Sequence, residues 1–390
     1  MNKRILYLTF YFEPDLCACS FRNSPLAHEL AKQGLKDGIE IDVLTTLPNR
    51  YSSYTAEAPE EEKIGNLFIK RIKIPTHQSG VKDQMLSFQH YFSEVRKYVK
   101  DKKYDLVFAS SSRLFTAYLG YRVAKNKKLP LYLDIRDLFV DTIKEVFPNP
   151  LIKAAVLPIL KYIESETFNY ASHINIISGG FKDYFKKYTS ATYTEYSNGI
   201  DPVFLDAVKF NSKDIADIKT ILYAGNIGEG QGLHRIIPVA AKKLGHNYKF
   251  KIIGDGGAKF KLIAALKDAS NVLVLPPVNR VSLIEEYNKA DFLFIHLNDY
   301  EAFKKVLPSK IFELGVFPKP LVAGVNGYSR QFIKENLPGS ILIEPCNGDE
   351  MANKIKACEA YTAVDRTLFI KNYKRETINK KMAQSILSYL

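Results

Sequence analysis

The fold class is decided by one stretch, residues 220–237, which reads TILYAGNIGEGQGLHRII. A short apolar run of strand type is followed by a glycine-rich turn and then by an amphipathic segment that begins near Leu233. This strand–turn–helix order is typical of a parallel sheet with helices on both faces. Glycines let backbone amides approach a ligand closely, and a helix start favours negative charge, so the turn predicts an anion site. A turn that is only flexible is the alternative.

The same order extends along the chain in both directions. Strand-like apolar runs precede the stretch at 5–12, 39–46, 67–74, 104–111, 129–135 and 173–178, and follow it at 248–256, 271–276, 291–297, 319–324 and 340–345. Amphipathic segments lie between most of these runs. The sequence therefore predicts an α/β protein with two Rossmann-like, doubly wound domains that face each other across a cleft.

The boundary between the two domains is expected in residues 198–219, which combine glycine, proline and polar residues without periodicity. We expect an N-terminal domain over residues 1–205 and a C-terminal domain over residues 206–373. The last segment, 374–390, has apolar residues on one face of a predicted helix. We expect this helix to pack back on the first domain.

Composition narrows the class of protein. The 390 residues, of which 46% are hydrophobic and 25% charged, indicate a folded globular chain. Cys17 and Cys19 form a C-x-C pair without a second pair at metal spacing, so zinc binding or redox chemistry is not expected. The strand-like run 5–12 leads directly into Glu13 and Asp15, which does not fit a signal peptide, and no apolar run approaches the roughly 20 residues of a membrane helix. We expect a cytoplasmic protein.

The net charge of +13 points to an anionic partner. The excess is spread over both halves of the chain and no nucleic-acid motif accompanies it, so nucleic acid is not the expected partner. Basic residues are dense in 96–128, and the apolar segment 146–168 is interrupted by proline. Both fall in the first domain, so we expect that domain to rest on an anionic membrane surface at the inner face of the membrane. A core helix beside solvated lysines is the alternative.

A second candidate site lies in VLPSKIFELG, residues 306–315. Pro308 and Ser309 favour a helix start, which places Lys310 in the first turn and Glu313 on the same face. An ammonium at a helix start suits a diphosphate, and a carboxylate can accept hydrogen bonds from two neighbouring hydroxyls, as in a ribose. The alternative is a capping arrangement of Ser309 and Glu313 with a solvated lysine. A second glycine-rich strand end, IIGDGG at 252–257, strengthens the case for this domain.

Charged residues also follow strands of the first half. Arg22 stands near the start of the first predicted helix, where it could meet a phosphate. Asp134, Arg136 and Asp137 follow the strand that ends near 135. Ligands collect at the carboxyl ends of strands in such sheets, so these residues are candidates for a second binding site. Ordinary surface charges are the alternative.

Several sequence segments, taken in their order along the chain, together resemble a known family over essentially the whole chain. The segments are YFEPDLCACSFRNSPLAHELAKQG, DIRDLF, SNGID, YAGNIGEGQGL, IIGDG, YNKADFLFIHL, PSKIFELGVFPKPLV and VNGYSRQFI. The chain resembles a retaining glycosyltransferase of family 4 with the GT-B fold. It is most similar to the transferases that build bacterial surface polysaccharides such as O-antigen and capsule.

The resemblance implies the substrates and the site residues. A UDP-sugar would donate an N-acetylated hexosamine or a deoxyhexosamine to a polyprenyl-diphosphate-linked glycan, without a metal or other cofactor. Catalytic roles would fall to Lys310, Glu313 and Arg136, and acceptor or phosphate contacts to Arg22, Asp134 and Asp137. The implied donor-binding residues are Gly225, Asn226, Gly228, Gln231, Gly254, Asp255, Gly256, Val278, Arg280, Pro308, Ser309, Lys310 and Glu313.

The sequence departs from the family pattern at several of these places. Lys305 stands where many members have the glutamate that orients the sugar, and Glu301 is the nearest substitute. Asn226 and Gln231 replace an arginine–lysine pair, and Arg136 replaces a histidine. Two other functions stay open: a nucleotide-sugar epimerase of the same architecture, and a non-catalytic module that binds nucleotide sugars or nucleic acid.

Overall fold

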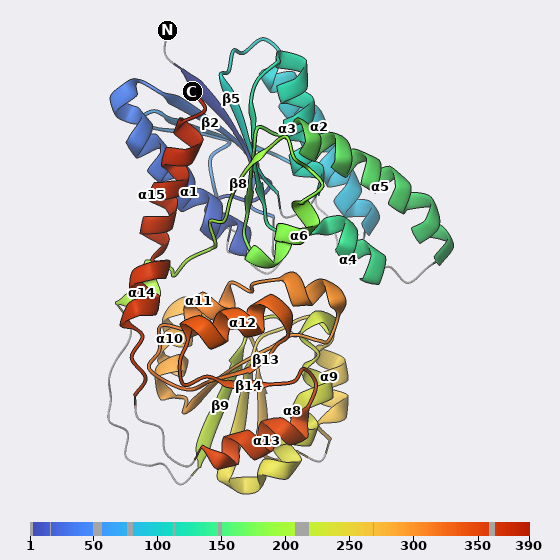
Figure 1. The fold of residues 1–390 in the computed structure, drawn as a ribbon, viewed down its shortest axis with the longest axis vertical. Coiled ribbons are helices and arrows are strands. Elements are labelled where there is room, and N and C mark those ends of the chain that lie inside the picture. The colour runs from blue at the N-terminus through green and yellow to red at the C-terminus, as the bar shows by residue number, and fades with distance from the viewer. Residues whose placement is uncertain are drawn as a thin grey trace. The chain divides into compact units, whose positions relative to one another are not determined.

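The computed structural model describes residues 3–15, 17–49, 57–75, 81–111, 114–146, 150–206, 218–267, 269–358 and 363–390. The chain divides into two compact units (Figure 1): Met1–Asn198 with Glu376–Leu390, and Gly199–Arg375. The first unit therefore ends earlier than the expected position 205, because Ile200 and Phe204 are buried in the core of the second unit. The central part of the expected linker, 207–217, lies outside the described residues.

The first unit contains one eight-stranded sheet in the order β3-β4-β2-β1-β5-β6-β7-β8. The strands are β1 (Arg4–Leu8), β2 (Glu40–Thr46), β3 (Glu61–Ile64), β4 (Leu67–Ile72), β5 (Leu106–Ser111), β6 (Leu131–Ile135), β7 (His173–Ile176) and β8 (Thr192–Thr194). All neighbouring pairs are parallel except β3 with β4. The sequence did not predict β3, whose exposed, charged residues carry no apolar alternation.

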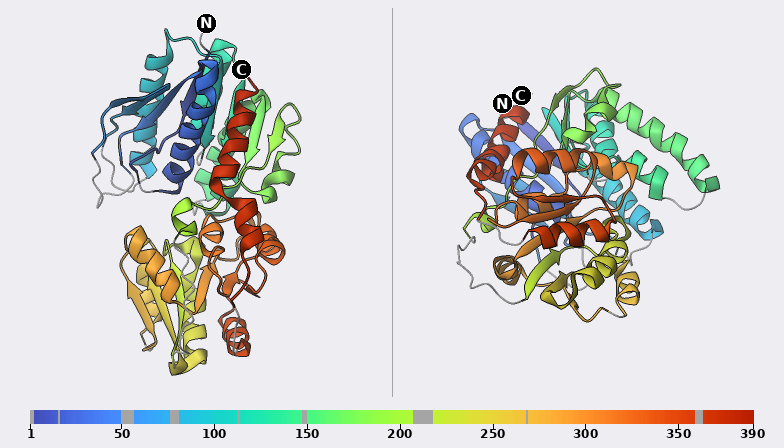
Figure 2. Two further views of the ribbon diagram at one scale, coloured as in Figure 1. Left: turned by 90° about the vertical axis from the view of Figure 1, so that its left-hand side faces the viewer. Right: turned by 60° about the horizontal axis from the view of Figure 1, so that its bottom comes forward.

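Helices cover both faces of this sheet. They are α1 (Ala18–Gly34), α2 (Val81–Val99), α3 (Leu114–Lys127), α4 (Phe139–Val146), α5 (Pro150–Tyr170), α6 (Lys182–Phe185) and α15 (Arg375–Leu387). Leu26 of α1 and Met382 of α15 share a core cluster with Tyr7 of β1. Helix α3 packs closely against β5, because a Cβ added to Gly120 would lie 2.8 Å from the Cβ of Ala109. The expected return of the last helix to the first unit is confirmed (Figures 1 and 2).

The second unit contains one six-stranded, fully parallel sheet in the order β11-β10-β9-β12-β13-β14. The strands are β9 (Lys219–Ala224), β10 (Tyr248–Ile253), β11 (Val272–Leu275), β12 (Phe292–His296), β13 (Leu321–Gly324) and β14 (Ile341–Ile343). The helices are α7 (Pro202–Leu205), α8 (Leu233–Leu244), α9 (Lys259–Ala265), α10 (Arg280–Lys289), α11 (Lys310–Leu314), α12 (Gly327–Asn336), α13 (Gly348–Ala357) and α14 (Thr367–Tyr373). The short 3-10 turns η3 (Glu229–Gln231) and η5 (Glu301–Lys305) follow β9 and β12.

The strand order fixes where a ligand can bind in the second unit. From β9 the chain builds outward through β10 and β11 on one side, then returns to β12 and builds outward through β13 and β14 on the other. The crevice at the carboxyl ends of β9 and β12 is thus the switch point, where open α/β sheets bind ligands. The quoted glycine-rich turn follows β9, and the segment that contains Lys310 follows β12.

Candidate functional site

The glycine-rich turn after β9 lies against Lys310 of α11. A Cβ atom on Gly225 would lie 3.9 Å from Cε of Lys310 and 3.5 Å from the hydroxyl of Tyr223. That hydroxyl donates a hydrogen bond of 2.6 Å to the carbonyl of Asn226. Gly225 and Lys310 are 85 residues apart in sequence. The two motifs that contain them therefore form one surface at the switch point.

Lys310 is held as a cation. Its Nζ lies 2.8 Å from Oε2 of Glu313 and 3.4 Å from the hydroxyl of Tyr287. Burial by itself lowers the pKa of Lys310, but Tyr287 and Glu313 raise it by more, so the pKa lies above its ordinary value. The Lys310 and Glu313 side chains are 27% and 21% exposed, which leaves the pair accessible to a ligand. An accessible, permanently charged ammonium beside a glycine-rich turn is suited to a diphosphate.

The capping alternative for this helix start is wrong. Ser309 precedes α11 but makes no side-chain cap hydrogen bond. Amides of the first turn instead donate to the carbonyls of Pro308 and Ser309, both at 3.1 Å. The Glu313 carboxylate is bound to Lys310 rather than to the backbone of the helix start.

The two glycine-rich strand ends pack backbone to backbone. A Cβ on Gly254 would lie 1.9 Å from the carbonyl oxygen of Gly225, and one on Gly256 would lie 2.6 Å from that of Ile227. The amide of Ile227 also donates to the carbonyl of Asp255 at 2.8 Å. Only glycine permits this approach, so the turns after β9 and β10 form one rigid ledge.

Two amide side chains brace the turn after β9. Nδ2 of Asn226 donates to Oε1 of Gln231 at 2.8 Å, and the backbone amide of Gly228 donates to the same oxygen at 3.2 Å. At these positions the family resemblance implies cations, but here the side chains bind each other. The positive charge at this part of the site therefore comes from Lys310.

Sequence reasoning missed the residue that anchors the turn, His296 at the end of β12. Its ring is 1% exposed and lies so close to β13 that a Cβ on Gly324 would be 2.4 Å from Cδ2. Nδ1 lies 2.6 Å from the carbonyl oxygen of Gln231, and the amide of Cys346 lies 2.8 Å from Nε2. A carbonyl can only accept, so Nδ1 carries the hydrogen and Nε2 accepts. Burial lowers the pKa of His296 to about 4, which agrees with this neutral form.

Asn298 continues the same anchor. Its backbone amide donates to the carbonyl of Gly230 at 2.8 Å, and its Nδ2 donates to the carbonyl of Glu229 at 3.0 Å. With His296, three successive carbonyls of the turn are thus bound from the end of β12. Nη1 of Arg235 donates to Oδ1 of Asn298 at 2.6 Å and fixes the amide. A histidine and an asparagine two residues apart at a strand end were the only sequence signal for this arrangement.

The predicted base-binding segment is partly engaged elsewhere. Nη2 of Arg280, at the start of α10, donates to Oδ2 of Asp201 at 2.6 Å, and Nη1 of Arg375 donates to the same oxygen at 2.8 Å. Arg280 therefore holds a structural ion pair in this structure. Val278 beside it is 40% exposed, and the Asp255 carboxylate is 64% exposed, so both are accessible.

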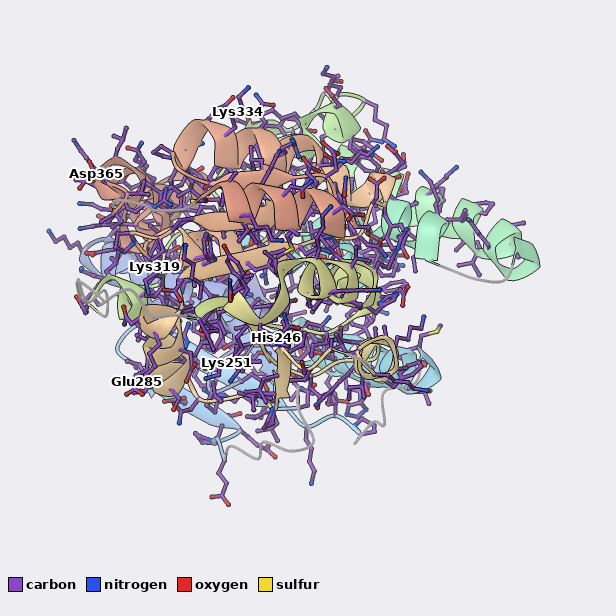
Figure 3. All side chains as sticks on the ribbon, turned by 90° about the horizontal axis from the view of Figure 1, so that it is seen from below. His246, Lys251, Glu285, Lys319, Lys334 and Asp365 are labelled. Atoms are coloured by element: carbon purple, nitrogen blue, oxygen red, sulfur yellow. The ribbon has the colours of Figure 1, made fainter. Side chains whose placement is uncertain are left out.

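Tyr287 is fixed in place by the end of its own helix. Lys319, labelled in Figure 3, donates to the carbonyls of Tyr287, Asn288 and Ala290 at 3.0, 2.6 and 2.5 Å. These bonds close the carboxyl end of α10. Burial raises the pKa of Tyr287 to about 12, so its hydroxyl remains neutral beside Lys310.

Lys305, which stands at the position of the family glutamate, ends the 3-10 turn η5. The proposed substitute Glu301 is 76% exposed and forms an ion pair with Lys304 of the same turn. Gly327 approaches this turn so closely that a Cβ would lie 2.1 Å from the carbonyl oxygen of Lys304. Lys305 cannot supply the carboxylate that would orient a sugar, whereas Glu301 is paired with Lys304 but exposed and so accessible.

In the first unit, the structure corrects the prediction for Arg22 and Asp134. These side chains are 3% and 0% exposed, and the guanidinium binds both carboxylate oxygens at 2.8 and 2.7 Å. Arg22 also donates to the carbonyls of Tyr196 and Ser197. Because these bonds occupy the guanidinium and the pair is buried, the pair ties α1 to β6 and to the segment after β8 rather than meeting an acceptor.

Arg136 and Asp137 remain candidates at the same edge of the first sheet. Nη2 of Arg136 donates to the carbonyl of Ala18 at the start of α1, at 3.0 Å. Its Nε is buried without a hydrogen-bond partner within the described residues, so a ligand oxygen could satisfy it. Asp137 lines a small recess with Phe139 and Phe168, and burial raises its pKa to about 6. The structure does not bring Asp137 together with Asp134 and Arg22.

Two features of the described residues concern metal binding and membrane spanning. Across the described part of the chain, no group of three or more histidine, cysteine, aspartate or glutamate side chains is placed to hold a metal ion. Nor do the described ranges contain a helix with the length and apolar character needed to cross a bilayer.

Comparison with known protein families concerns mainly the second unit. The family model "Glycosyl transferases group 1" matches residues 207–375, which is nearly the whole second unit. A curated relative, "Putative colanic acid biosynthesis glycosyl transferase WcaI" of Escherichia coli (strain K12), is 27% identical over 182 residues. This match covers 45% of the chain and 44% of the relative, so the chain aligns with less than half of that protein's length.

Solved structures share the fold over the full chain. Sucrose-phosphate synthase from Thermosynechococcus elongatus matches with a TM-score of 0.75 at 14% identity and covers 99% of both chains. Anabaena Alr3699/HepE in complex with UDP-glucose matches with a TM-score of 0.68 at 15% identity, also over 99% of both chains. The lipopolysaccharide glycosyltransferase WaaG matches with a TM-score of 0.65 at 15% identity, over 98% of this chain and 99% of its own. At such identities these matches establish the GT-B fold alone.

Proposed function

Residues 207–375 match the family model "Glycosyl transferases group 1", and from this match we propose that the chain is a sugar-nucleotide-dependent glycosyltransferase. The observation that carries the proposal is the accessible Lys310–Glu313 pair beside the glycine ledge at the switch point. The donor we propose is a UDP-sugar, because the fold relative Alr3699/HepE was solved with UDP-glucose. The sugar is an N-acetylated hexosamine or a deoxyhexosamine.

The chain's own residues suffice for the phosphate side of the reaction. Lys310 would neutralise the charge that develops on the departing diphosphate, a task for which a fixed cation in a partly desolvated site is effective. Glu313 can hold Lys310 and accept from a ribose hydroxyl at once, because a carboxylate has about four acceptor positions. The reaction would then proceed without a metal ion and with retention at the sugar carbon, by front-face displacement assisted by the departing phosphate.

The acceptor we propose is a polyprenyl-diphosphate-linked glycan of a bacterial surface polysaccharide. Two observations in the first unit support a peripheral position on an anionic membrane surface. The outer parts of α2 and α5 expose large apolar side chains: Met85, Leu86, Ile159 and Tyr162 are 59–67% exposed. Basic side chains of α2 and α3 line one groove together with Tyr162, so cationic groups and an exposed aromatic ring occur together there, as in interfacial helices.

The decisive experiment is a screen of UDP-sugars for slow hydrolysis in the absence of acceptor. A transferase should release UDP from one donor, together with a free sugar that initially keeps its anomeric configuration. An epimerase, which shares this fold, would convert the sugar while it remains attached to UDP. A binding module would retain the nucleotide without turnover, and either of these two results would overturn the proposal.

A further inference from the structure

A large cationic groove lies in the first unit, outside the sites described above. It has a volume of about 1000 Å³ and is bordered by α2, α3 and α5. Six cations line it: Arg96, Lys97, Lys100, Arg122, Lys125 and Lys127. The single acid among the lining residues, Glu166, is already bound, because the hydroxyl of Tyr121 donates to it at 2.8 Å. Like charges gathered in a groove repel one another, so an anionic ligand would relieve that repulsion.

Two of the cations are fixed in position by aromatic rings. The Arg96 guanidinium carbon lies 5.9 Å from the ring centroid of Phe92 on α2, and that of Arg122 lies 5.7 Å from the centroid of Tyr118 on α3. Nη1 of Arg122 also donates to the hydroxyl of Tyr118 at 2.9 Å. The two rings stack with centroids 6.3 Å apart. A stacked aromatic pair thus carries one guanidinium from each of two helices, at little cost in side-chain freedom on binding.

The lysines complete a ring of donors around this pair. Nζ of Lys127 donates to the carbonyls of Lys100 and Lys102, which joins the ends of α3 and α2. Nζ of Lys125 lies 5.0 Å from the ring centroid of Tyr121 and donates to its hydroxyl at 2.6 Å. Arg96, Arg122, Lys125 and Lys127 are thus held by contacts within the groove, whereas Lys97 is paired with Glu94 at 2.7 Å.

From this geometry we propose that the groove binds a phosphate-monoester headgroup of a membrane lipid. Planar guanidinium groups bind phosphate oxygens in pairs, and neighbouring cations favour the doubly charged form of a monoester over the singly charged phosphodiester. At about 1000 Å³ the groove is at the upper end of small-ligand pockets, so it admits a phosphate headgroup with room to spare. Its neighbour Tyr162 is 67% exposed and Ile159, one turn away, is 61% exposed, so a lipid surface would cover apolar groups that a nucleic acid would leave wet.

This inference rests on the proposed membrane position but not on the transferase activity. It adds a selective headgroup site to a face that would otherwise bind any anionic surface. The test compares vesicles that contain phosphatidic acid with vesicles that contain phosphatidylglycerol, matched for surface potential. Cosedimentation of the full chain should favour phosphatidic acid by on the order of tenfold, since a charge-assisted pair of hydrogen bonds is gained only with the monoester.

Matched variants separate a site from general charge. Arg96→Lys with Arg122→Lys keeps every charge but removes the planar donors, so it should lose the preference and keep binding to phosphatidylglycerol. Lys36→Ala with Lys380→Ala removes two exposed charges near α1 and on α15, across the sheet from the groove, and should keep the preference (Figure 1). Equal binding of the wild-type chain to both vesicles, or an intact preference in the arginine-to-lysine variant, would overturn the site.

Two further binding measurements test whether the groove takes a different ligand. Inorganic phosphate that binds at this groove without vesicle binding would show a soluble anion site and would reject the lipid headgroup. Binding of single-stranded RNA without vesicle binding would reject it as well. UDP affinity and donor hydrolysis are measured on the same variants. In the wild-type chain, absent headgroup preference with intact donor turnover contradicts only this inference, and absent turnover with an intact preference contradicts only the proposed function.

Discussion

Each unit places a cation and a carboxylate at the carboxyl ends of its strands, but the two pairs differ in what they can do. In the first unit, Arg22 and Asp134 are 3% and 0% exposed and the guanidinium is bound on several sides. In the second unit, Lys310 and Glu313 are 27% and 21% exposed. A buried pair cannot exchange its partner for a ligand, whereas a partly exposed pair can. The comparison teaches that exposure, rather than residue type, separates a structural pair from a binding pair.

The largest effect should follow from breaking the buried pair. Asp134→Ala leaves the Arg22 charge without a partner inside the first unit, which typically costs about 3–5 kcal/mol of unfolding free energy. Glu313→Ala, the matched change in the exposed pair, should cost about 1 kcal/mol or less. Urea unfolding followed by circular dichroism measures both. Equal stability of the two variants would contradict the distinction between the pairs.

Each unit also buries one neutral histidine, and acid should destabilise both units. Burial lowers the pKa of His173 and of His296 to about 4. An imidazole whose pKa is lower in the folded state takes up protons on unfolding, so the unfolding free energy should fall as the pH drops from about 6.5 to about 4 and then level off. The loss is about 3 kcal/mol per histidine at most.

Unfolding free energies measured between pH 7 and pH 4 in His173→Gln and His296→Gln test this expectation. Each variant should show a shallower pH dependence than the wild-type chain. If the wild-type stability does not fall over this range, the buried neutral histidines are not as described.

The exposed pair should control nucleotide binding without affecting the fold. Lys310→Ala removes the cation proposed for the diphosphate, and a charge-assisted contact contributes about 1.5–3 kcal/mol, or roughly tenfold to a hundredfold in affinity. Calorimetry with UDP should show this loss at an unchanged unfolding temperature. Arg22→Ala should do the reverse and reduce stability first. Unchanged UDP affinity in Lys310→Ala would remove the proposed donor site.

A smaller effect should distinguish the two bonds of His296. Asparagine can place an amide nitrogen near Nδ1, so His296→Asn should keep the bond to Gln231 and with it the turn. Glutamine reaches instead toward the position of Nε2, so His296→Gln should keep the bond to Cys346 and weaken UDP binding by about fivefold, the value of one hydrogen bond.

If His296 has a purely structural role, His296→Asn and His296→Gln should bind UDP with the same affinity. Comparing their unfolding temperatures shows whether His296→Asn and His296→Gln are equally stable, so that the affinity difference can be assigned to the turn.

Removal of divalent metal ions is expected to have no effect on donor hydrolysis. Because Lys310 is proposed to neutralise the diphosphate, donor hydrolysis should be unchanged by EDTA. Strict dependence on magnesium or manganese would mean that the positive charge at the second unit's site comes from a metal rather than from the lysine.

The sequence was sufficient where local pattern determines structure. The run 220–225 became β9, the glycines after it became the ledge, and the last helix returned to the first unit. It was insufficient where distant residues meet. The contact of Arg22 with Asp134 spans 112 positions, and nothing in the local pattern of either residue indicates it. His296 was missed for the same reason, since its two partners lie in separate turns that only the folded sheet brings together.

The return of α15 to the first unit has a consequence for how the chain is made. Met382, Ala383 and Ile386 belong to the same core as Ile5 and Tyr7, at the opposite end of the polypeptide. During synthesis the second unit, which is continuous in sequence, can close before the chain is finished. The first unit cannot complete its core until Met382, Ala383 and Ile386 leave the ribosome. Of the two units, the one whose synthesis begins first is thus the one whose core is completed last.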